Sequence, residues 1–162
     1  MASTIPDFAQ PDFAKLKAGM KSTWMAGDFG RIANFSAQAA DDFVQRLVIQ
    51  TGARVLDVAC GTGNTAIPAA RAGGSVTGCD IASNLLDQAE LRAVAENLDI
   101  TFKEGDAEDL PFPADSFDVD ILAGLRFKKT DRSFCYVGAE SASQAFVSSD
   151  DDEQNVLLGT LR

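Results

Sequence analysis

A glycine-rich turn between a buried strand and a helix is the feature that most constrains the fold of this 162-residue chain. The run Ala53–Ala59 is apolar and β-branched, as expected for a strand that is buried on both faces. Gly61 and Gly63 follow, and their missing side chains permit a tight turn and let a ligand approach the backbone amides. Asn64–Gly73 is helical in pattern, with a bend expected at Pro68. The order predicts a strand–loop–helix unit that binds a nucleotide.

The pattern continues with further strands and one more helix. We expect strands at Ser75–Asp80, Asp99–Glu104 and Phe117–Ala123. The intervening helix is capped by Ser83 or Asn84 and presents apolar residues at helical spacing: Ala82, Leu85, Leu86, Ala89 and Ala93. Alternating strands and helices predict an α/β fold with a mostly parallel sheet and right-handed crossovers.

Two amphipathic helices are expected upstream of this sheet, each with an apolar face that must cover a surface. The first carries Phe13, Leu16, Met20 and Trp24 and ends near Gly27. The second carries two adjacent stripes and stops at Gly52, where a left-handed terminus favours glycine. The stripes are Ile32, Phe35, Ala39, Phe43 and Leu47, and Ser36, Ala40, Val44 and Val48.

Three acidic residues follow the ends of successive strands, where ligands bind in open α/β sheets. Asp57 suits an amino-acid ammonium better than a phosphate. Asp80 can accept both hydroxyls of a ribose, and Asp106 can accept an adenine amino group while the Ala107 amide donates to a ring nitrogen. Each residue also has a structural alternative: Gly61 and Gly63 as turn glycines, Asp80 and Asp106 as helix caps, and Asp57 as the partner of an arginine.

The segments VLDVACGTGNTAIPAA (55–70), Val76–Ile81 and GDAEDLPFPADSFD (105–118) resemble class I S-adenosylmethionine (SAM)-dependent methyltransferases of the ubiquinone/menaquinone-biosynthesis type. The resemblance covers about residues 13–120 and implies a Rossmann-like fold with SAM as cofactor. It implies a cofactor-binding set in which Ala59 replaces the usual first loop glycine and Ile81 packs near the adenine: Asp57, Ala59, Gly61, Gly63, Asp80, Ile81, Asp106 and Ala107. Residues 24–29 look like a segment that folds over SAM, although we interpret Trp24 itself as helix packing.

Composition narrows the function further. The formal charge of -10 disfavours nucleic acids and anionic membranes as partners. The absence of histidine excludes a Ser-His-Asp triad and a Cys/His zinc site, and we expect no metal. Cys60, Cys79 and Cys135 have no paired spacing and are interpreted as reduced. Without an apolar leader or membrane-spanning stretch, the chain is expected to be cytoplasmic.

The resemblance ends downstream of Asp118. We expect three regions: an N-terminal helical cap (1–52), a SAM-binding core (53–123) and an atypical tail (124–162). The tail shows no Arg-Pro-Gly-Gly-like turn and is too short for three strands with their helices. We therefore expect a sheet truncated in its C-terminal half, through an altered reading frame or a replaced C-terminus. Its open edge would invite dimerisation. The basic residues Arg126, Lys128, Lys129 and Arg132 and the acidic run 150–153 are interpreted as solvated.

The expected function is methyl transfer from SAM to a small-molecule acceptor by in-line displacement. No general base is required, and no catalytic residue is nominated. A non-catalytic SAM-binding remnant is the first alternative, because the tail departs from the pattern. The second is an NAD-binding oxidoreductase, because Gly61-x-Gly63-x-x-Ala66 also matches the dinucleotide fingerprint.

Overall fold

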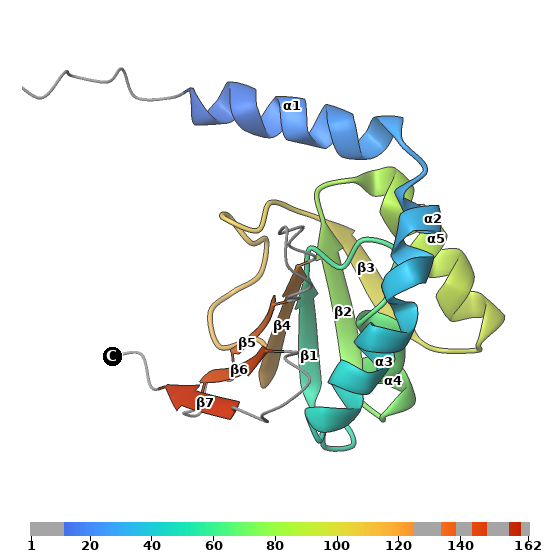
Figure 1. The fold of residues 1–162 in the computed structure, drawn as a ribbon, viewed down its shortest axis with the longest axis vertical. Helices are drawn as coiled ribbons and strands as arrows, with labels where there is room; N and C mark the ends of the chain where they lie inside the picture. Colours follow the sequence, from blue (N-terminus) through green and yellow to red (C-terminus); the bar gives the residue numbers. More distant parts are fainter. Residues whose placement is uncertain (1–11, 125–133, 139–143, 149–155, 160–162) are drawn as a thin grey trace, which may run out of the picture.

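A computed structural model describes residues 12–124, 134–138, 144–148 and 156–159 of the chain (Figure 1). The described strands form one sheet in the order β3-β2-β1-β4-β5-β6-β7. The first four are parallel: β1 (Arg54–Val58), β2 (Ser75–Asp80), β3 (Ile100–Glu104) and β4 (Val119–Gly124). This arrangement confirms the predicted α/β Rossmann-like fold.

The crossover helices cover one face of the parallel strands (Figure 1). α4 (Ala66–Arg71) joins β1 to β2, and α5 (Ser83–Ala95) joins β2 to β3. α3 (Ala37–Arg46) packs on α4 and adds Phe43 and Val44 to the core on this face. All five apolar residues predicted for the face of α5 are buried.

β1 is buried on both faces, as predicted. Val55 packs in the helix-covered core, whereas Leu56 and Val58 face a second cluster with Cys79. The chain after β3 covers this second cluster with Leu110, Phe112 and Phe117, and the last two rings meet edge to face at 5.2 Å. The carboxyl ends of β1, β2 and β3 are thereby brought to one edge of a well-packed sheet.

The N-terminal helices differ from the expectation in two respects. α1 (Phe13–Ala26) forms where predicted, with Asp12 accepting from the Lys15 amide, but its apolar stripe is exposed rather than packed on a surface. The expected second helix is broken into α2 (Phe29–Ala33), the 3-10 turn η1 (Asn34–Ser36) and α3. The Ser36 hydroxyl donates to the Ala33 carbonyl at this break. The change of helical period leaves Ile32 and Phe35 exposed.

Three predicted helix signals were placed wrongly. α3 ends at Arg46, and Val48 is the left-handed residue nearest this end; Gly52 is also left-handed but lies six residues beyond the helix. The N-cap of α5 is Ala82, and neither Ser83 nor Asn84 caps the helix. α4 begins at Ala66 rather than at Asn64, so Pro68 lies in its first turn, where a missing N–H costs little.

The tail supplies three strands, which the sequence did not predict. β5 (Phe134–Gly138), β6 (Gln144–Ser148) and β7 (Val156–Gly159) continue the sheet in antiparallel pairs beside β4. Antiparallel strands need only short connections, so three of them fit where crossover helices would not. The open edge predicted beside the fourth strand is therefore filled. The basic residues 126–132 and the acidic run 150–153 lie outside the described residues. In the described part of the chain, no helix is long and apolar enough to cross a membrane.

Ile121 provides a test of the core. It is 0% exposed in the helix-covered cluster, so Ile121→Ala should lower the free energy of unfolding by about 2–5 kcal/mol through lost burial and a cavity. The matched control is Leu91→Ala on the exposed side of α5, with a change within about 0.5 kcal/mol. Urea unfolding measures both, and equal losses would contradict this placement.

Candidate functional site

A cavity of about 430 Å³ lies at the carboxyl ends of β1, β2 and β3. Six of the eight predicted cofactor-binding residues line it: Ala59, Gly61, Asp80, Ile81, Asp106 and Ala107. Asp57 and Gly63 are not among the lining residues. The structure thus brings the three strand ends together at one hollow, as the sequence predicted.

The loop after β1 is held in a left-handed conformation at alternate residues. Ala59, Gly61 and Gly63 have φ of 56°, 53° and 80°. Ala59 stands where the resemblance implies a glycine, and its Cβ makes this left-handed conformation costly. At Gly63 an added Cβ would lie 3.4 Å from both Ala89 and Ile67, which is ordinary van der Waals contact, so the left-handed φ rather than lack of space favours glycine there. Its predicted contact with a cofactor remains a prediction.

Asp80 joins the loop to the start of α5. Its Oδ2 accepts from the Gly61 amide at 2.8 Å, and its Oδ1 accepts from the Ala82 amide at 2.8 Å. The cap-like alternative is therefore present, and the predicted ribose contact stays a prediction. A carboxylate has about four acceptor positions, so these two bonds leave capacity for ligand hydroxyls at the cavity.

Asp57 is completely buried behind the loop. Its Oδ2 accepts from the Thr65 hydroxyl at 2.6 Å, whereas its buried Oδ1 has no hydrogen-bond partner within the described part of the chain. Burial raises the pKa of Asp57 to about 7, against the smaller effects of the hydrogen bonds from Thr65 and Ala66. The arginine partner considered as an alternative is not present among the described residues; Thr65 takes that place.

Asp106 is engaged by α1. The Lys17 ammonium lies 2.6 Å from Asp106 Oδ2 and 2.6 Å from Glu108 Oε2, and Lys21 pairs with Glu104 on the same side. The hydrogen bond from Lys17 is the main reason that the pKa of Asp106 is lowered. An adenine amino group at Asp106 would compete with Lys17 for the same carboxylate.

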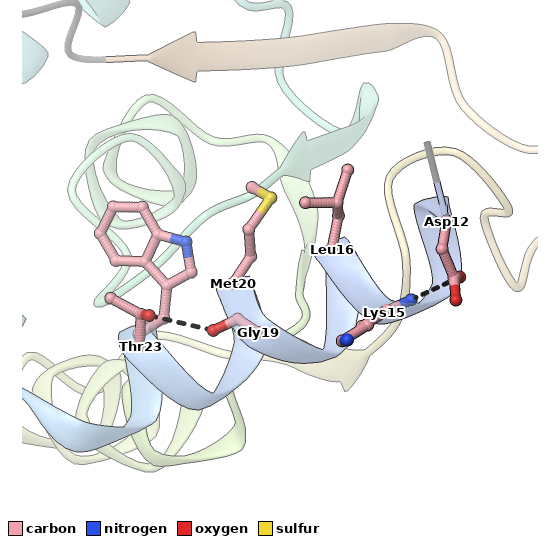
Figure 2. Close-up of a pocket in the computed structure, with 7 residues that line it drawn as sticks. Asp12, Lys15, Leu16, Gly19, Met20 and Thr23 are labelled. Carbon is pink, nitrogen blue, oxygen red and sulfur yellow. Dashed lines mark hydrogen bonds between the residues drawn. The ribbon is translucent and has the colours of Figure 1, made fainter. Parts of the chain in front are cut away.

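α1 also forms the outer wall of the site. Met20 and Trp24 line both the cavity and a more open hollow of about 710 Å³ along α1. Figure 2 shows Leu16 and Met20 projecting from the same side of the helix. The rings of Trp24 and Phe29 pack with their centroids 4.6 Å apart, as expected for helix packing. Trp24 also borders the cavity, a position that the sequence did not predict.

Besides Trp24, sequence reasoning missed five lining residues: Lys17, Met20, Leu85, Gly105 and Glu108. Lys17, Met20 and Trp24 recur at helical spacing, so the face of α1 was readable, but its position over the strand ends was not. Glu108 lies in the turn that Asp106 closes by accepting from the Glu108 amide at 2.9 Å. No local signal connects this turn with Lys17.

Comparison with known proteins identifies the family. The model of the methyltransferase domain matches residues 55–136, half of the chain. The chain belongs to the methyltransferase domain family. The family bears out the cofactor that the resemblance implied, S-adenosylmethionine.

The methyltransferase domain has curated relatives in several bacteria. An uncharacterized protein of Mycobacterium tuberculosis is 43% identical over 99 residues, covering 60% of this chain and 36% of the relative. Demethylmenaquinone methyltransferase of Geobacillus kaustophilus is 42% identical over 91 residues, covering 53% of this chain and 39% of the relative. The YcgJ protein of Bacillus subtilis, a solved structure, has a TM-score of 0.49 at 27% identity and covers 53% of this chain and 37% of its own. The matched part thus spans well under half of these relatives.

The residues present fit the family's cofactor. Asp57 Oδ1 is a buried, unpaired acceptor within the described residues, two positions before Ala59, which suits an ammonium group near the loop. Asp80 has acceptor capacity for a ribose, and the Asp106–Ala107 segment offers an acceptor and a backbone amide at the cavity rim.

The protonation of Asp57 gives a testable pH dependence. Its pKa of about 7 in the fold, against 3.8 ordinarily, means that the folded chain retains a proton that the unfolded chain releases between these pH values. The stabilisation of the fold by this retained proton is complete below pH 3.8 and is lost as the pH rises through about 7. The asparagine side chain of Asp57→Asn stays neutral at every pH. The free energy of unfolding of this variant should therefore rise relative to that of the wild type between about pH 4 and about pH 8.

Urea unfolding across this range measures the difference between variant and wild type. Asp87→Asn, on the exposed side of α5, is the matched control. A difference that stays constant with pH for Asp57→Asn would show that Asp57 is ionised throughout.

Proposed function

We propose that this chain binds SAM at the carboxyl ends of β1, β2 and β3 and transfers its methyl group to a small-molecule acceptor. The observation that carries the proposal is the shared cavity: the glycine loop, Asp80 and Asp106 come from three strand ends and line one hollow. Asp57, whose Oδ1 has no partner among the described residues, lies directly behind that loop.

Each part of the site would have a distinct role. Asp80 would accept ribose hydroxyls while it keeps the Gly61 amide in place. Asp106 and the Ala107 amide would hold the adenine beside Ile81, and the Asp57 carboxylate would face the ammonium across the loop. When bound, SAM supplies a methyl group already activated by its sulfonium. The protein's contribution is alignment and exclusion of water, so we nominate no general base.

The acceptor is proposed to be small and largely apolar. The hollow beside the cavity shares Met20 and Trp24 with it and is otherwise lined by Leu16, Gly19 and Thr23, with Asp12 and Lys15 toward the start of α1. The apolar part of an acceptor bound along α1 would therefore lie next to the cofactor. The similarity to a protein named demethylmenaquinone methyltransferase supports the same class. The charge of -10 argues against a nucleic acid or an anionic membrane as partner.

A cytoplasmic location completes the proposal. Cys60 and Cys79 are both buried free thiols, which fits a reducing compartment. Burial raises the pKa of the Cys60 thiol and keeps it protonated.

Calorimetric titration tests the cofactor assignment. The chain should bind SAM and S-adenosylhomocysteine more tightly than NAD. Asp80→Asn should weaken S-adenosylhomocysteine binding by about tenfold or more, because it removes a charged acceptor from the cavity. Asp87→Asn, an exposed acid on the adjoining helix, should leave the affinity unchanged. Tighter binding of NAD than of SAM would overturn the assignment in favour of an oxidoreductase.

Turnover tests the acceptor. With SAM and a panel of apolar phenols, quinols and amines, the chain should form S-adenosylhomocysteine, which mass spectrometry detects. Leu16→Ala should raise the acceptor KM by up to about tenfold with the KM for SAM unchanged, because Leu16 borders the α1 hollow and does not line the cavity at the strand ends. Leu91→Ala, an exposed leucine of α5, is the matched control. Binding without turnover across the panel would favour the non-catalytic remnant.

A further inference from the structure

Arg92 of α5 directs its charge at backbone and amide oxygens of the loop after β1. Its Nη1 lies 2.6 Å from the Thr62 carbonyl, 2.7 Å from Asn64 Oδ1 and 3.1 Å from Thr62 Oγ1. Within the described residues it forms no ion pair, unlike Arg71, which holds Glu96 through two nitrogens. Burial is the main effect that lowers the pKa of Arg92, while the more distant charges of Glu96 and Asp41 act in the opposite direction.

Asn64 extends this contact to the N-terminal helices. Its Nδ2 donates to the Ala33 carbonyl at 2.7 Å and lies 3.2 Å from the Ser36 hydroxyl, at the break between α2 and α3. Arg92 therefore fixes both the loop and the amide that ties the loop to the helical segment upstream.

Hydrogen bonds from two sides hold adjacent residues of the loop. The Gly61 amide donates to Asp80, at the end of β2, and the Thr62 carbonyl accepts from Arg92, on the helix that comes after β2. Thr62 lies between Gly61 and Gly63, both left-handed, in a turn that the Gly63 amide closes by donating to the Cys60 carbonyl at 2.8 Å. The contacts from Asp80 and Arg92 tie this turn to the rest of the fold. Asp80 lines the cavity, whereas Arg92 does not and acts from behind the loop.

We infer that Arg92 is a positioning residue for the cofactor loop: it holds the Thr62 carbonyl and Asn64 so that Ala59 and Gly61 present a fixed surface to the cavity. Arg92 does not touch the ligand. Its relevance to SAM rests on the proposed function, whereas its effect on the loop does not. The role predicts an ordered loop even without ligand.

Hydrogen exchange of the ligand-free chain tests the effect on the loop. Arg92→Met should accelerate exchange of the amides in residues 60–65 by about tenfold or more relative to the wild type, because charge-assisted bonds to the loop are lost. Arg92→Lys keeps one charged donor and should restore part of the protection. Arg71→Met is the matched control, since it also loosens α5 but touches no loop residue. Two results would overturn the inference: exchange in Arg92→Met that is accelerated evenly over β1–β4, or exchange of the loop amides that is accelerated no more in Arg92→Met than in Arg71→Met.

Calorimetry with S-adenosylhomocysteine on the same variants tests the consequence for binding. We expect about tenfold weaker affinity in Arg92→Met, partial recovery in Arg92→Lys and wild-type affinity in Arg71→Met. Unchanged affinity in Arg92→Met beside a binding wild type would overturn the positioning role. If the wild type itself does not bind, the proposed function fails, while loop exchange still decides whether Arg92 orders the loop.

Discussion

The Asp80 carboxylate is the constraint on which the site depends. One oxygen holds the Gly61 amide of the loop after β1, and the other holds the Ala82 amide at the start of α5. A single buried side chain thus sets the separation between two neighbouring βα units at the carboxyl edge of the sheet. The same charge lines the cavity, so structure and ligand binding draw on one carboxylate. This explains why structural and functional interpretations of Asp80 could not be separated in the sequence.

The strands and most of the cavity could be predicted because their signals are local. β2 begins and ends where predicted, and β1 carries the apolar run of a doubly buried strand. The carboxyl ends of parallel strands must share an edge, so Asp80 and Asp106 could be placed together without coordinates. The roles of the two glycines could not be separated from the sequence: Gly61 borders the cavity, while Gly63 does not and is favoured by its left-handed φ.

The remaining features depend on contacts that are distant in sequence. Nothing near Lys17 indicates that it meets Asp106, and nothing in α5 indicates that Arg92 reaches the Thr62 carbonyl. The break at Asn34–Ser36 lies where Asn64 bonds to Ala33, a tertiary contact that overrides the continuous helical pattern. The prediction that the tail could not supply three strands was wrong for another reason. It assumed that each strand needs a crossover helix, whereas antiparallel strands do not.

α1 is seated on the domain by charge rather than by burial. None of its residues is buried, and its described ion pairs to the domain run from Lys17 and Lys21 to carboxylates of the chain at and just after β3. Such partly exposed pairs weaken as added salt shortens the Debye length, whereas the apolar packing of α3 does not. The attachment of the outer wall of the site is therefore weakened by salt more than the packed core is. Ionic strength acts on the shape of the ligand hollow more than on the sheet beneath it.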